Sequence, residues 1–277
     1  MTNFFIPEPR PPRMLKPNLF SAFDLQIDAL LKAPSARDHF KVDGAGLTIA
    51  VLDTGLRVTH KCFTGRVIET RNFTQEDGGD PNVVTDRSGH GTNVTGIIAA
   101  GTNDERRGIA PSANIVALKV IPAKTFSQIY DALKWVDENA ARLKITVANL
   151  SLGAPDINLT DDTNVAQQNA DFVQLLEGLT AKKVAVVVAA GNDYYRFQEE
   201  GMSMPAIFRQ VIAVGAVYDT SFGARDYENG ASAITTHADQ LTPFSQRLSK
   251  ETSPECYTDI FSAGASATSA GAENDDA

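Results

Sequence analysis

The sequence lacks the features that would place it in a membrane or outside the cell. No apolar run approaches the ~20 residues that a membrane-spanning helix needs. The first 18 residues carry five prolines and no apolar stretch typical of a secretory signal. Cys62 and Cys256 are the only cysteines in 277 residues, which fits a reducing compartment better than a disulfide framework. We therefore expect a cytoplasmic protein.

Basic residues are also scarce relative to acidic ones. The chain has 25 Lys and Arg against 34 Asp and Glu, a formal net charge of −9. An acidic surface repels phosphate backbones and anionic lipid, so nucleic acid and membranes are not expected partners. With 43% hydrophobic and 21% charged residues, the composition is that of an ordinary globular protein with a substantial core.

The chain divides into two parts of unequal size. Residues 1–32 form a proline-rich N-terminal extension, with a short amphipathic helix predicted within 20–32. Residues 33–277 show neither an internal repeat nor a change in composition, which predicts one domain.

Short apolar runs alternate with helical patterns throughout this domain. Helices are predicted after His90, over 125–144 and within 162–180, and Thr125 with Gln128 forms a capping-box pattern. Strands are predicted at 47–53, 114–121, 145–152, 184–190 and 210–217. This alternation predicts an α/β fold in three layers, a mostly parallel central sheet with helices on both faces.

Polar residues follow three of the predicted strands. Asp53 ends the first strand, Ser151 lies near the end of the third, and Asn192 follows the fourth. The carboxyl ends of parallel strands share one rim, where functional groups collect. A carboxylate such as Asp53 can hold an imidazole in one tautomer and stabilise its protonated form. Taken alone, an Asp that caps a turn is the simpler interpretation.

His90 lies between two glycines at the start of a predicted helix. The helix dipole disfavours the charged imidazolium there, which keeps the ring neutral and ready to accept a proton. Asn192 carries an amide donor that can stabilise an oxyanion. A structural histidine and a Gly-Asn turn are the alternatives when each residue is considered by itself.

Taken together, six short blocks resemble the subtilisin-like serine proteases in sequence and in order. The resemblance runs from about Ala33 to the C-terminus. Asn93 and Thr95 stand where the family usually has His and Ala, on the helix beyond the histidine. The blocks are VLDTG (51–55), GHGTNVTG (89–96), GIAP (108–111), NLSLG (149–153), VVAAGN (187–192) and VIAVGA (211–216).

The resemblance implies a role for each of these residues. Asp53 would be the carboxylate of an Asp-His-Ser triad, His90 the general base and Asn192 the oxyanion donor. The segment Ser151-Leu152-Gly153 would present its backbone to an extended peptide. The implied function is a serine endopeptidase that hydrolyses peptide bonds in protein or peptide substrates.

The nucleophile of the family is missing from the 277 residues. The family's serine follows Gly-Thr and precedes a helix, and no serine here has that setting. Ser203 is expected in a loop before the last predicted strand, and Ser266 and Ser269 fall in the stretch upstream of the nucleophile motif. We expect a domain truncated before its catalytic serine and inactive by itself. A non-catalytic relative that binds peptides is the alternative.

Two further expectations concern metals and the N-terminal extension. The chemistry requires no cofactor, and no metal-ligating set is predicted in the site. The acidic segment 75–86 is either a structural Ca²⁺ site, since that ion is common in the family, or a solvated loop. Residues 4–10, FFIPEPR, loosely resemble the Ile-Pro element of intracellular subtilisins. They would either lie across the substrate groove or form a disordered tail.

Overall fold

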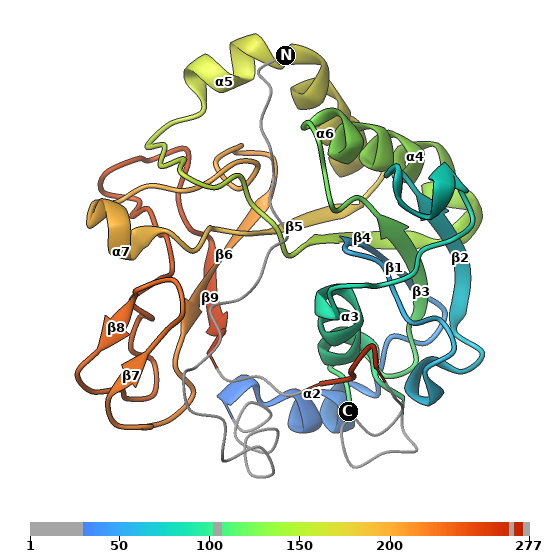
Figure 1. The fold of residues 1–277 in the computed structure, drawn as a ribbon, viewed down its shortest axis with the longest axis horizontal. Coiled ribbons are helices and arrows are strands. Elements are labelled where there is room, and N and C mark those ends of the chain that lie inside the picture. Colours follow the sequence, from blue (N-terminus) through green and yellow to red (C-terminus); the bar gives the residue numbers. More distant parts are fainter. Residues whose placement is uncertain (1–29, 102–106, 266–268, 274–277) are drawn as a thin grey trace.

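The computed structural model describes residues 30–101, 107–265 and 269–273, in which helices and strands alternate along the chain (Figure 1). The helices are α2 (Ala33–Phe40), α3 (His90–Ala99), α4 (Ser127–Leu143), α5 (Thr163–Gln168), α6 (Ala170–Ala181) and α7 (Tyr194–Phe197), with 3-10 turns η1 (Lys61–Phe63) and η2 (Glu76–Gly79). The strands are β1 (Thr48–Asp53), β2 (Val67–Asn72), β3 (Asn114–Lys119), β4 (Ile145–Leu150), β5 (Ala185–Ala189), β6 (Ile212–Val217), β7 (Arg225–Asp226), β8 (Ser232–Ala233) and β9 (Ile260–Ala263). The segment 4–10 and nearly all of the helix predicted within 20–32 lie outside the described residues.

Seven strands form the central sheet in the order β2-β3-β1-β4-β5-β6-β9. Every neighbouring pair in it is parallel. All seven strands therefore end at the same edge, and the loops that follow them share that edge.

Helices cover the sheet on both faces, as alternate residues of β3 show. Val116 and Leu118 belong to the main core, together with side chains of α4 and α6. Ile115 and Ala117 point to the opposite face and join a smaller core that includes Ala99 of α3. Because successive strand residues face opposite sides, α3 lies on one face and α4 and α6 on the other. The three-layer α/β fold predicted from the sequence is confirmed.

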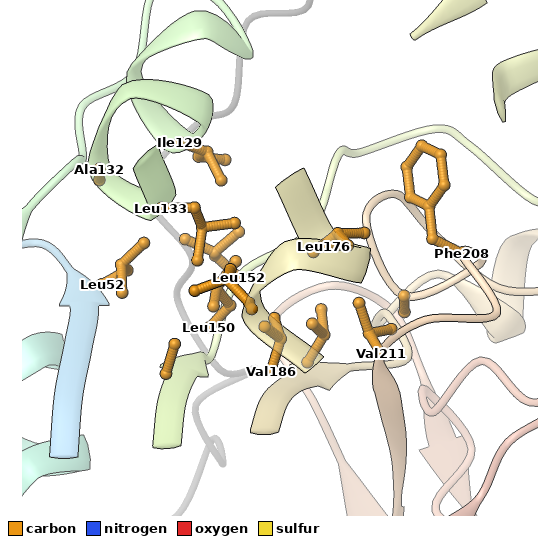
Figure 2. Close-up of a cluster of buried hydrophobic side chains, with 14 of the residues drawn as sticks. Leu52, Ile129, Ala132, Leu133, Leu150, Leu152, Leu176, Val186, Phe208 and Val211 are labelled. Atoms are coloured by element: carbon orange, nitrogen blue, oxygen red, sulfur yellow. The ribbon is translucent and has the colours of Figure 1, made fainter. Parts of the chain in front are cut away.

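The main core fixes the strands that carry the candidate site. Figure 2 shows Leu52 of β1, Leu150 of β4 and Val186 of β5 packed against Leu133 of α4 and Leu176 of α6. Each of these side chains is at most 2% exposed. Burial of one such side chain stabilises the fold by roughly 1.5–3 kcal/mol. The ends of β1, β4 and β5 are therefore held on a rigid base.

Two local expectations need correction. The helix predicted within 162–180 is broken at Asn169, whose backbone is not helical and whose Nδ2 donates to the Val165 carbonyl at 2.8 Å. At the start of α4, Oε1 of Gln128 accepts from the N–H of Thr125 at 3.3 Å and from that of Lys124 at 2.6 Å. The hydroxyl of Thr125 is hydrogen-bonded to the Ser127 hydroxyl instead of a helix N–H. Only the glutamine half of the predicted capping box forms.

The sequence did not predict the two edge strands, β2 and β9, or the β7–β8 hairpin. The hairpin lies over a third small core, in which the hydroxyls of Tyr218 and Tyr227 are hydrogen-bonded at 2.8 Å. Within the described ranges, no helix is both long enough and apolar enough to cross a bilayer.

Candidate active site

The three strand ends singled out from the sequence lie side by side. β1, β4 and β5 are consecutive in the sheet and parallel. Asp53 is the last residue of β1, Ser151 follows β4 directly, and Asn192 lies three residues beyond β5. One edge of the sheet therefore carries all three.

Asp53, which is buried, and His90, which is partly buried, form a hydrogen-bonded pair. Oδ1 of Asp53 lies 2.7 Å from Nδ1 of His90, and the two side chains are 1% and 11% exposed. An ionised carboxylate can only accept, so Nδ1 carries the proton and donates it to Asp53. This tautomer leaves Nε2 with a free lone pair. The ring is therefore set up to accept a proton at Nε2.

The pKa of His90 results from opposing effects. Burial lowers it, whereas the charge of Asp53, its hydrogen bond and the charge of Asp86 raise it, and the net result is a raised pKa. The folded protein thus stabilises the imidazolium despite the unfavourable helix N-terminus. A base whose protonated form is stabilised in this way can take up a proton during a reaction.

Close backbone packing brings α3 to the end of β1. A Cβ on Gly91, the residue after His90, would lie 2.2 Å from the Gly55 carbonyl oxygen and 3.2 Å from Oδ1 of Asp53. Only a residue without a side chain permits this approach. Gly91 therefore allows α3 to come close enough for the imidazole to reach the carboxylate.

The side-chain amide of Asn192 can be reached by a bound molecule. Its side chain is exposed, and its backbone carbonyl accepts a hydrogen bond from Nδ2 of Asn229 at 3.4 Å. None of the residues that the structure describes forms a hydrogen bond with its side-chain amide. The amide is therefore available to a bound molecule, and its role as an oxyanion donor stays a prediction.

The segment 151–153 has one residue anchored in the core. Leu152 is 2% exposed and packs in the main core, while the Ser151 hydroxyl accepts from Nδ2 of Asn149 at 3.0 Å. Gly153 lies against Ser203, whose Oγ would be 2.9 Å from a Cβ at that glycine. The anchored side chain of Leu152 fixes the backbone on either side of it. Peptide binding along this backbone stays a prediction.

Ser203 is a buried structural residue. It is 1% exposed, and its hydroxyl donates to the Ala154 carbonyl at 2.6 Å. Its Cβ also fills the space beside Gly191. A nucleophile needs an exposed hydroxyl near a base, and Ser203 has neither.

No serine, threonine or cysteine in the described part of the chain is hydrogen-bonded to His90. Ser269 is 9% exposed and lies against Gly96 of α3, two turns beyond the histidine. Ser266 lies outside the described residues. Within the described residues, His90 is therefore hydrogen-bonded to a carboxylate but not to a nucleophilic side chain.

The acidic segment 75–86 already binds basic side chains. Lys119, which is fully buried, places Nζ 2.7 Å from Oε2 of Glu76 and 3.7 Å from Oδ2 of Asp77. Arg87 forms a further ion pair with Asp77. No group of three His, Cys, Asp or Glu side chains gathers to bind a metal anywhere in the described ranges. The carboxylates of Glu76 and Asp77 are thus already paired with basic side chains, and a Ca²⁺ ion in this segment stays a prediction.

Sequence reasoning missed Thr54 and Asp86, which connect Asp53 to the start of α3. Thr54 Oγ1 donates to Oδ1 of Asp86 and accepts from the Gly91 N–H. The available signal was an Asp four residues before the histidine, a residue type that commonly caps helix N-termini.

A parallel α/β sheet with an Asp–His pair at its carboxyl edge is the arrangement expected of a subtilisin-like protein. The chain belongs to the subtilase family, which residues 44–274 match. It is 33% identical over 178 residues to the major intracellular serine protease of Bacillus subtilis (strain 168), covering 64% of this chain and 52% of that protein. The intracellular serine protease of Paenibacillus polymyxa is 32% identical over 196 residues, covering 68% and 54%. The chain thus spans about half the length of these relatives.

Solved structures give the same assignment. Sphericase superposes with a TM-score of 0.64 and 26% identity, covering 84% of this chain and 71% of that one.

Proposed function

We propose that the chain is part of a serine endopeptidase in which Asp53 and His90 activate a serine that follows residue 277 in a longer polypeptide. The observation that carries the proposal is the 2.7 Å hydrogen bond between the two side chains. The missing Gly-Thr-Ser motif and the half-length match to the relatives support a nucleophile from further residues.

In the proposed reaction, the serine hydroxyl attacks the scissile carbonyl and gives its proton to Nε2 of His90. The imidazolium is stabilised by Asp53, and Nδ2 of Asn192 donates to the developing oxyanion. The imidazolium then protonates the leaving amine as the C–N bond breaks. A water molecule then attacks the acyl-enzyme carbonyl and gives its proton to Nε2 of His90. The imidazolium returns this proton to the serine oxygen as the acyl–oxygen bond breaks and the carboxylic acid is released. No metal or organic cofactor takes part in these steps.

The proposed substrates are proteins or peptides bound in extended form beside Ser151–Gly153. Support comes from the anchoring of Leu152 and from the protease names of the relatives. We further propose that the enzyme acts inside the cell. The intracellular designation of two relatives and the presence of only two cysteines in the sequence favour this location.

The test extends the coding sequence past residue 277 through the next Gly-Thr-Ser and measures kcat/KM on casein-derived peptides. His90→Ala should reduce kcat by about 10⁶ and Asp53→Asn by about 10⁴. The matched control is His237→Ala, an exposed histidine outside the site, which should leave activity unchanged. Ser203→Ala should change activity by only a few-fold, since its hydroxyl is buried.

Two outcomes would contradict the proposal. One is a reading frame that closes without a Gly-Thr-Ser, together with peptide binding by the 277-residue chain, which would establish the non-catalytic alternative. The other is peptidase activity of the 277-residue chain that Ser203→Ala abolishes.

A further inference from the structure

Asp86 is a buried carboxylate that the proposed reaction does not use. It lies in the loop between η2 and α3 and is 8% exposed. Its Oδ1 accepts from Thr54 Oγ1 at 2.8 Å and from the N–H groups of Ser88 and Gly89 at 3.2 and 2.8 Å. Its Oδ2 accepts from the N–H and the hydroxyl of Thr92 at 2.8 and 2.6 Å. Five donors therefore converge on one side chain.

These donors come from both sides of the Asp–His pair. Thr54 follows Asp53 directly, whereas Gly89 precedes His90 and Thr92 follows two residues after it. Because Thr54 Oγ1 also accepts from the Gly91 N–H at 2.9 Å, the two segments are linked twice. Hydrogen bonds thus connect the end of β1 to the start of α3 along two routes, one through Asp86 and one through the Asp53–His90 pair.

The negative charge of Asp86 also stabilises the start of α3 and the protonated form of His90. The N-terminus of α3 carries a partial positive charge, which a buried carboxylate offsets. Among the described residues, Asp53 on β1 and Asp86 are the charged groups that raise the pKa of His90. The titratable side chains of η1, Lys61 and Cys62, do not contribute to this shift although η1 packs near α3.

We propose that Asp86 is a positioning residue, whose carboxylate fixes the start of α3 against the end of β1 and so keeps Nδ1 of His90 directed at Asp53. Its catalytic consequence rests on the proposed function, but its effect on the ring does not. Asn at this position would keep one acceptor and place an N–H₂ group against the Thr92 N–H. The helix start would then lose at least one of its bonds.

The experiment uses the 277-residue chain and the imidazole NMR signals of ¹⁵N-labelled histidine. The hydrogen-bonded Nδ1 proton of His90 should give a downfield signal with slow exchange. Asp86→Asn should make that proton exchange roughly tenfold faster and should lower the pKa of His90. The matched control is Asp80→Asn, an exposed acid at the start of the same loop, which should change neither the exchange rate nor the pKa.

Thr54 keeps the test decisive if Asp86→Asn does not fold. Thr54→Val removes the hydroxyl that links Asp86 to Gly91 and should accelerate the exchange, whereas Thr54→Ser restores the hydroxyl and should rescue it. A purely structural role would leave the His90 signals unchanged in every folded variant.

Asp53→Asn separates failure of this proposal from failure of the proposed pair. If Asp53→Asn removes the downfield signal while Asp86→Asn and Thr54→Val leave it unchanged, the positioning role is wrong and the pair stands. If Asp53→Asn also leaves the signal and the pKa unchanged, the Asp53–His90 pair itself is refuted.

Discussion

Replacing Gly91 with alanine tests the close packing that brings His90 to Asp53. The added Cβ would lie 2.2 Å from the Gly55 carbonyl oxygen, whereas side-chain carbons tolerate no approach below 3.0 Å. The start of α3 must therefore move by about 0.8 Å or more. That movement also stretches the 2.9 Å bond from the Gly91 N–H to Thr54.

The expected loss of stability follows from three contributions. Overpacking at a well-packed contact costs about 1–3 kcal/mol, and weakening one buried hydrogen bond costs about 1 kcal/mol. Alanine returns about 1 kcal/mol through its higher helix propensity. The net expectation is a free energy of unfolding lower by about 1–3 kcal/mol, accompanied by a weaker Nδ1 proton signal of His90.

Urea unfolding followed by fluorescence of Trp135, the only tryptophan, measures this change. Gly178→Ala on α6 is the matched control, because its Cβ would meet nothing closer than Oδ1 of Asp137 at 3.6 Å. That variant should gain about 0.5–1 kcal/mol from helix propensity alone. If Gly91→Ala is as stable as Gly178→Ala and keeps the His90 signal, the close-packing argument is refuted.

Three further predictions concern pH, the core and the ion pair between the buried Asp162 and the exposed Arg209. The folded state raises the pKa of His90, so protonation of this histidine stabilises the fold. That stabilisation is fully present below pH ~6.5 and is lost as the pH rises through the folded pKa. The free energy of unfolding of His90→Gln, measured in urea, should lack this pH dependence. Leu133→Ala should lower the free energy of unfolding by about 2–5 kcal/mol, because its side chain is fully buried in the core. Ile234, which is 94% exposed, is the control, and Ile234→Ala should lower it by less than about 0.5 kcal/mol. Equal losses in the two variants would contradict the assigned core. Arg209→Ala should cost about 1–3 kcal/mol at pH 7, because it leaves the carboxylate of Asp162 buried without its guanidinium. The hydrogen bond from Arg209 lowers the pKa of Asp162, so in the wild type the stability that this pair contributes is lost as the pH falls through the folded pKa of Asp162. If Arg209→Ala loses as much stability at acid pH as at pH 7, this assignment is wrong.

The strands that the sequence predicted are those with a neighbouring strand on each side in the sheet. β1 has neighbours on each side in the sheet and reads as a continuous apolar run, TIAVLD. β2 lies at the edge of the sheet, and its sequence, VIETRN, mixes charged and apolar residues. An edge strand has solvent on one side, so its residues carry no continuous apolar pattern. β9, at the other edge, has only four residues, IFSA, which are too few to form a recognisable pattern.

Some residues of the candidate site could be identified from the sequence, and others could not. Asp53 and His90 were identified because their residue types and flanking glycines carry a chemical meaning in the sequence. Asp86 was missed because its contribution consists of hydrogen bonds to backbone N–H groups and hydroxyls that converge only after folding. The break at Asn169 was missed for a related reason, since the competing side-chain bond depends on local backbone geometry.

Fluorophosphonate labelling tests the central claim most directly, because the reagent modifies only a serine activated by a neighbouring base. The extended polypeptide and the 277-residue chain would be treated in parallel, and the modified residue located by mass spectrometry. The account predicts one labelled serine after residue 277, abolished by His90→Ala, and no labelling of the 277-residue chain. Labelling of Ser203, or labelling that persists in His90→Ala, would contradict it.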